Sequence, residues 1–158
     1  MAKVLLLGEN NPYGDDPHFA LYPSPVGCTG WRLCHKVLEL PADTYLEKFE
    51  RRNLLQRPKW SAPLARLAAR TLLAELGEGA RVVVLGARVA TALDLPSTPF
   101  ETYDLDACLL PARMNLPMIP RGVRIAVLPH PSGLCRVWGS PNSYERARRS
   151  VFALERVS

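Results

Sequence analysis

The sequence predicts an α/β protein: a three-layer α/β/α sandwich whose central sheet is mostly parallel and has four strands. Two observations favour this fold. Short apolar runs rich in branched residues, typical of buried parallel strands, recur along the 158 residues. They alternate with segments in which apolar residues recur at helical spacing. Because no linker, repeat or low-complexity tract interrupts the chain, we expect one domain over residues 1–158.

Four segments are predicted to be strands. Lys3–Leu7, Arg81–Leu85 and Val123–Leu128 lack the alternation of half-buried strands, which favours a central position in the sheet. Phe49–Leu55 is predicted to be the fourth strand. Residues 94–122, with five prolines, predict no regular element.

Helices are predicted between these strands. The clearest one is capped by Ser61, has Pro63 in its first turn and ends at Gly77. Four further helices are expected over residues 29–41, 43–49, 87–93 and 140–157.

The composition limits the classes of function. No apolar run is long enough to span a bilayer and no secretory signal is recognisable, so we expect a cytoplasmic protein, or a nuclear one in a eukaryote, that does not contact membranes. We also expect a monomer. Its four cysteines are then expected to be reduced thiols. Their spacing fits no common zinc or iron–sulfur pattern, and no metal or other cofactor is expected. The formal charge of +5 suits a polyanionic partner, although many proteins that bind no nucleic acid share such a charge.

Two loops contain the polar residues that indicate function. Gly8–Gly14 follows the first predicted strand, and Pro129–Leu134 follows the last one. Ligands of open parallel sheets bind just outside the carboxyl ends of the strands. If these two strands are neighbours, the amides of Asn10 and Asn11 face the imidazole of His130 across a cleft.

These groups are suited to one kind of chemistry. A neutral amide is not a base near pH 7, but its oxygen can hold a water molecule. An imidazole can donate to a leaving group on which negative charge develops. Together they suit hydrolysis through a cation-like transition state, as in glycosidic cleavage. Each loop alone is equally typical of a plain turn, so it is their joint placement that favours catalysis.

The two loops resemble motifs of the uracil-DNA glycosylase superfamily. Its members have one strand ending in Gly-x-Asp/Asn-Pro or Gly-Glu-Ala-Pro-Gly and a late strand ending in His-Pro-Ser or Asn-Pro-Ser. His130-Pro131-Ser132-Gly133-Leu134 matches the second motif well, whereas the first loop has one extra residue. The similarity also covers residues 49–55 and 82–93. It implies a monofunctional DNA glycosylase that flips uracil or a modified pyrimidine out of DNA, hydrolyses its glycosidic bond and leaves an abasic site.

The resemblance implies catalytic roles for several residues. The water would be positioned by Asn11 or Asn10, depending on where the extra residue is placed. His130 would donate to a carbonyl of the pyrimidine and stabilise the leaving anion. Glu9 resembles the glutamate of the Gly-Glu-Ala-Pro-Gly members, with a solvent-exposed acid as the alternative. Because the motif loops contain no lysine to form a Schiff base, strand cleavage is not expected.

Other residues would bind the base. Asn53 would pair with its Watson–Crick edge, or else only cap the end of a strand. Tyr13 would exclude methylated pyrimidines. Phe19 is the preferred ring for stacking, with Tyr22 and Trp31 as alternatives, and at least one of the three is expected in the core.

A last group would bind DNA. Leu134 resembles the wedge residue that enters the duplex where the nucleotide leaves, although a core leucine is the alternative. Ser132 and Gly133 belong to the same motif, and Arg136 beside them would contact a phosphate or remain a solvated charge.

Three alternatives to uracil excision stay open. The long Pro/Gly-rich segment Asp15–Gly30 could shape an unusual pocket, which would suit removal of a hypermodified base from phage DNA in anti-phage defence. An asparagine in place of the usual catalytic aspartate is also compatible with an inactive nucleic-acid-binding member of the fold. A hydrolase of free nucleosides or nucleotides is the third.

Overall fold

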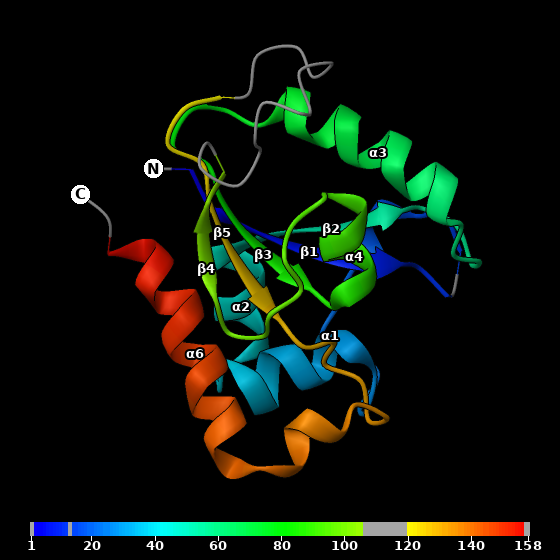
Figure 1. Cartoon of the computed structure of the whole chain (residues 1–158). Helices are drawn as coiled ribbons and strands as arrows, with labels where there is room; N and C mark the ends of the chain where they lie inside the picture. Colours follow the sequence, from blue (N-terminus) through cyan, green and yellow to red (C-terminus); the bar gives the residue numbers. More distant parts are fainter. Residues whose placement is uncertain (1, 13, 106–119, 157–158) are drawn as a thin grey trace.

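The computed structural model describes residues 2–12, 14–105 and 120–156. At its centre lies a five-stranded sheet with the strand order β2-β1-β3-β5-β4 (Figure 1). The first four strands in this order are parallel, and β4 pairs antiparallel with β5 at the edge. The strands are β1 (Val4–Asn10), β2 (Phe49–Leu55), β3 (Arg81–Leu85), β4 (Thr102–Asp104) and β5 (Arg124–Leu128).

The mostly parallel α/β sheet is confirmed, but two expectations about it were wrong. The sheet has five strands and not four, because Thr102–Asp104, inside the proline-rich region, pairs with Arg124–Ala126. In addition, β3 lies between β1 and β5, so the strands before the two functional loops are not neighbours. Since β1, β3 and β5 are parallel, their carboxyl ends still meet at one edge of the sheet.

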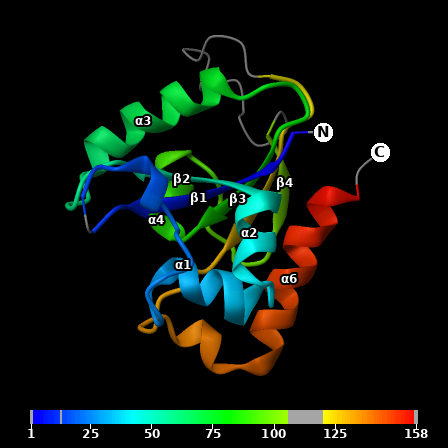
Figure 2. The same cartoon turned by 180° about the vertical axis from the view of Figure 1, so that it is seen from behind.

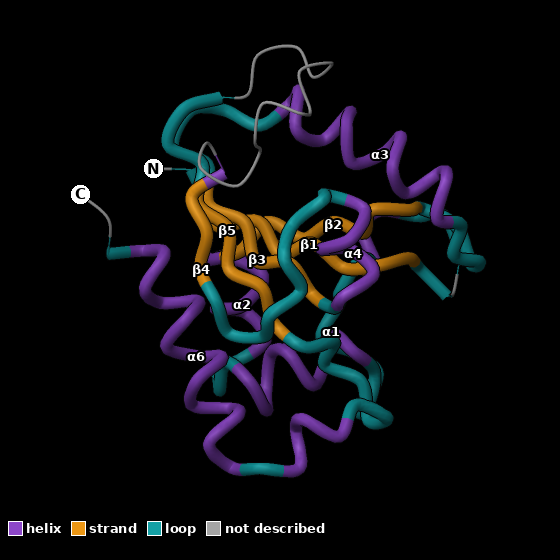
Figure 3. Tube along the Cα trace, viewed as in Figure 1, coloured by secondary structure: helices purple, strands orange, loops and turns teal. Residues whose placement is uncertain are grey.

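Helices cover both faces of the sheet (Figure 2). On one face lie α3 (Ala62–Glu75) and α4 (Ala87–Ala92). On the other lie α2 (Ala42–Lys48), α6 (Pro141–Glu155) and α1 (Thr29–Trp31), which continues as a π-helical stretch over Arg32–Val37. The described residues also contain two short 3₁₀ turns, Pro17–Phe19 and Arg136–Gly139. Figure 3 shows the strands in the middle and the helices on either side.

The residues of β1 explain the two apolar cores. Leu5 and Leu7 belong to the core beneath α3 and α4, whereas Val4 and Leu6 belong to the core on the opposite face. Alternate side chains of a strand point to opposite faces, so a continuous apolar run is needed where both faces are covered. None of the helices in the described ranges combines the length and apolar character that a membrane crossing requires.

The helix expectations agree with the structure to within a few residues. Ser61 caps α3 as predicted, and its hydroxyl accepts a hydrogen bond from the backbone N–H of Leu64 at 3.4 Å. The helix predicted over residues 29–41 is present but ends at Val37. That over 140–157 is α6.

Candidate functional site

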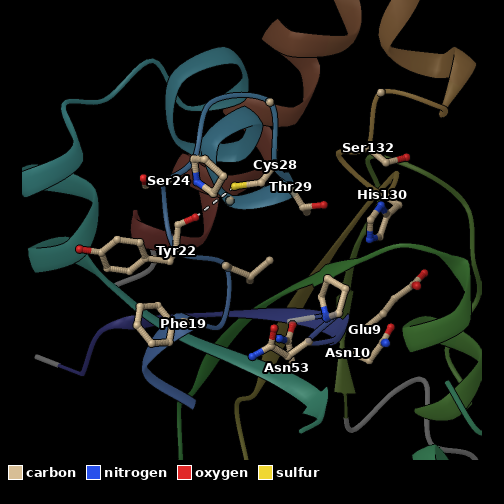
Figure 4. Close-up of a pocket in the computed structure, with 17 residues that line it drawn as sticks. Glu9, Asn10, Phe19, Tyr22, Ser24, Cys28, Thr29, Asn53, His130 and Ser132 are labelled. Atoms are coloured by element: carbon tan, nitrogen blue, oxygen red, sulfur yellow. Dashed lines mark hydrogen bonds between the residues drawn. The ribbon is translucent and has the colours of Figure 1, made fainter. Parts of the chain in front are cut away.

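A pocket of about 700 Å³ opens at the carboxyl ends of β1, β2 and β5 (Figure 4). Its lining includes both amides of the first loop, Asn53 of β2 and His130 of the loop after β5. Glu9 and Phe19 also line it. The structure therefore brings together side chains from distant parts of the chain that the sequence assigned to one site.

The amides of Asn10 and Asn11 are held in different ways. The Asn10 side-chain nitrogen donates to the backbone carbonyls of Pro58 at 2.8 Å and Arg57 at 3.3 Å. The side-chain oxygen of Asn10 accepts no hydrogen bond within the described residues. Asn11 is buried, and its side-chain nitrogen donates to the carbonyl of Asp16 at 3.4 Å. Asn10 thus joins the end of β1 to the segment after β2 and keeps its oxygen available.

Asn53 is a buried polar group at the floor of the pocket. It is 5 % exposed, and its side-chain amide makes no hydrogen bond within the described part of the chain. The alternative of a strand-end cap is not supported, because a cap would hydrogen-bond to backbone. Asn53 pairs in register with Gly8 of β1, where a Cβ would lie 2.5 Å from Asn53 Oδ1. Buried polar groups are normally hydrogen-bonded, so an amide facing an open pocket indicates a polar ligand.

His130 lies on the side of the pocket formed by the loop after β5. Its backbone carbonyl accepts hydrogen bonds from the Trp138 indole N–H and the Ser132 backbone N–H, both at 2.8 Å. Burial lowers the pKa of the imidazole; the nearby Glu9 carboxylate opposes this and Arg88 reinforces it. The ring is therefore neutral near pH 7, a state in which it can donate one hydrogen bond.

Glu9 and Arg88 form an electrostatic pair beside the imidazole. The Glu9 carboxylate lies 3.8 Å from the Arg88 guanidinium, which also lies over the ring of Trp60. The side chain of Glu9 is largely buried, so the alternative of a fully solvent-exposed acid is wrong. Arg88 was not predicted from the sequence. Its position two residues after Gly86, at the carboxyl end of a predicted strand, was the available signal.

The wall opposite His130 comes from the segment between β1 and α1. Phe19 and Tyr22 meet edge to face with ring centres 5.8 Å apart, and Phe19 is 53 % exposed. This segment is anchored from below: Arg51 donates to the carbonyl of Ala20 at 2.8 Å, and the buried Tyr45 hydroxyl donates to that of Leu21 at 2.9 Å. A long segment without much regular structure is thereby held against the sheet.

The residues expected to bind DNA lie beside the pocket. Leu134 is 93 % exposed, which excludes the core alternative. Ser132 and Gly133 line the pocket, and Arg136 is exposed at the start of the following 3₁₀ turn. Such an exposed leucine next to a pocket has the accessibility that a wedge requires.

Of the remaining expectations, Trp31 does not line the pocket but packs against His35. Tyr13 falls outside the described residues. Cys28, Cys34 and Cys135 form no disulfide, and Cys108 is not among the described residues. Within the described ranges no cluster of three or more His, Cys, Asp or Glu side chains is arranged to hold a metal ion.

Comparisons with models of protein families and with curated protein sequences give no match. The geometry of the site indicates what it can do. It holds an amide that can hydrogen-bond to a polar edge of a ligand, a neutral imidazole donor, one carboxylate, and an amide oxygen that accepts no hydrogen bond within the described residues.

Proposed function

We propose that this chain is a monofunctional DNA glycosylase with a three-layer α/β/α fold like that of the uracil-DNA glycosylase superfamily, and that it excises uracil or a modified pyrimidine. The observation that carries the proposal is that one pocket is lined by the imidazole of His130 and by the buried amide of Asn53, which has no hydrogen-bond partner among the described residues. The exposed Leu134 lies beside this pocket.

The pocket suits a single extruded base. The Asn53 amide has a donor and an acceptor on one planar group, which matches the N3 and C4 positions of a pyrimidine. Phe19 exposes its ring to the pocket and can stack on the base. With Asn53 on the Watson–Crick edge, the C2 carbonyl is directed toward His130 on the neighbouring side.

Hydrolysis then needs a water and a stabilised leaving group. Water attacks the anomeric carbon while the bond from this carbon to N1 of the base breaks, and the base keeps the bonding electrons. The Asn10 oxygen is suited to hold the water because its nitrogen is fixed by two carbonyls. The water proton passes to Glu9 or to solvent. The neutral His130 ring donates to the C2 oxygen, where negative charge develops.

Leu134 and Arg136 supply the contacts to DNA. A leucine inserted into the duplex occupies the gap left by the flipped nucleotide and offsets part of the unstacking cost, which is about a few kcal/mol. Arg136 follows this leucine by two residues and is placed to contact phosphate.

The test is base release from duplex oligonucleotides that carry uracil or modified pyrimidines, followed by alkaline cleavage of abasic sites. We expect release by the wild type and a loss of about a hundredfold or more in kcat for His130→Ala, which removes the donor. Asn53→Ala should lose activity while remaining folded. His35→Asn and Asn142→Ala, which lie outside the pocket, are the matched controls.

Other outcomes favour other functions. DNA binding without release from any substrate, unchanged in His130→Ala, would identify a binding module. Release from free nucleosides but not from DNA would identify a nucleoside hydrolase.

A further inference from the structure

The volume of the pocket is larger than a bare pyrimidine requires. Cavities of about 300–1,000 Å³ hold drug-sized ligands, and the pocket here measures about 700 Å³. An unmodified base is much smaller than such a ligand. Part of the space belongs to the deoxyribose, but the lining extends well beyond the groups that face a base, to Ser24, Pro25, Gly27 and Thr29.

The position of this extra space is informative. In a pyrimidine ring C5 lies directly across from C2. A base whose C2 carbonyl meets His130 and whose N3 and C4 edge meets Asn53 therefore directs C5 away from His130. Figure 4 shows Phe19, Tyr22 and Ser24 on that far side of the pocket. The lining beyond the base is thus placed to receive a substituent on C5.

The chemistry of this lining limits what the substituent can be. The hydroxyls of Ser24 and Thr29 make no hydrogen bond within the described residues, although both side chains line the pocket. Of the described lining residues only Glu9 carries a formal charge, and it lies on the His130 side. Hydroxyls that have no hydrogen-bond partner among the described residues and no charged side chain beside them are suited to bind a neutral group that has hydroxyls of its own.

We infer that the base excised is a pyrimidine with a bulky, uncharged, hydroxyl-bearing group at C5, such as a hexose joined through a hydroxymethyl carbon. This inference rests on the proposed glycosylase function, and it replaces the expectation that Tyr13, which lies outside the described residues, excludes methylated pyrimidines. Ser24 binds a hydroxyl of the substituent, and the Phe19–Tyr22 wall lies along its apolar face. The bond that breaks is still the one between the base and deoxyribose, so water is the only co-reactant.

The first experiment compares duplexes that are identical except for one base: uracil, 5-hydroxymethylcytosine, and glucosylated 5-hydroxymethylcytosine. We expect kcat/KM to be highest for the glucosylated base, by about tenfold or more over the other two. Uracil released as fast as the glucosylated base would overturn the inference but leave the proposed function intact. No release from any of the three, or from the wider panel of modified pyrimidines, would overturn both.

The second experiment fills the far side of the pocket. Ser24→Trp should lower kcat/KM for the glucosylated base by about tenfold or more while base release from the smaller substrates is retained. Ser97→Trp, at an exposed serine outside the pocket, is the matched control. Thermal melting checks that both variants fold. Equal losses on large and small substrates in the folded Ser24→Trp variant would contradict a pocket for the substituent.

Discussion

Glu9 and His130 face each other across Gly86, the glycine that directly follows β3. A Cβ on Gly86 would lie 3.2 Å from Glu9 Oε1 and 3.3 Å from His130 Cβ. Because β3 separates β1 from β5, the loops that follow β1 and β5 can meet only over the end of β3. A residue without a side chain at this point lets the carboxylate approach the imidazole.

Gly86→Ala should therefore disturb both stability and the site. Gly86 has φ of 99° and ψ of 156°, a conformation that is essentially restricted to glycine and costs other residues about 1–3 kcal/mol. We expect a loss of that size in the free energy of unfolding, measured by urea denaturation, together with slower base release. Gly77→Ala is the control, since a Cβ there meets nothing within 4 Å. Equal stability of the two variants would contradict this role of Gly86.

The pKa of His130 should respond in opposite directions to two substitutions. Removing the positive charge in Arg88→Ala should raise it, whereas removing the negative charge in Glu9→Gln should lower it. NMR titration of the imidazole resonances measures both, and the missing signal in His130→Asn assigns the resonance among the three histidines. Shifts in the same direction in both variants would show that the two charges do not act on this ring.

The same lowered pKa predicts how stability depends on pH. Below the ordinary histidine pKa of about 6.5, the unfolded state takes up a proton at position 130 that the folded state still resists. The free energy of unfolding of the wild type should therefore decrease as the pH falls below about 6.5, until the folded state is protonated as well. His130→Asn should lose less stability over that window. Identical pH profiles in urea denaturation would contradict the assignment.

The parallel strands and the site loops could be predicted from sequence because they depend on local signals. A continuous apolar run followed by glycine, asparagine and proline identifies the end of β1 without any knowledge of its neighbours. The strand order could not be predicted this way, since nothing local indicates that β3 separates β1 from β5. Arg88 and the short β4 were missed for a related reason: their roles depend on partners distant in sequence, Glu9 and β5.

Leu134→Ala separates binding of DNA from folding. Because the side chain is 93 % exposed, the free energy of unfolding should change by less than about 0.5 kcal/mol. Base release from duplex DNA should slow by about tenfold or more, since the gap in the duplex is no longer filled. Release from single-stranded DNA should change little. A similar loss on both substrates would show that Leu134 does not act as a wedge.

Asn10 provides a physical reason for an amide where an aspartate would be the stronger base. Its side-chain nitrogen donates to the carbonyls of Arg57 and Pro58, and a carboxylate would replace this donor with an oxygen acceptor facing both carbonyl oxygens. Asn10→Asp should therefore destabilise the fold by about 1–3 kcal/mol. Asn10→Ala should slow base release more than Asn11→Ala. The reason is that the side-chain oxygen of Asn10 accepts no hydrogen bond within the described residues and can hold the water. Urea denaturation and single-turnover base release measure the two effects separately. If Asn11→Ala instead causes the larger loss of turnover in a folded protein, the water is held by Asn11, and the role of Asn10 is to attach β1 to the segment after β2.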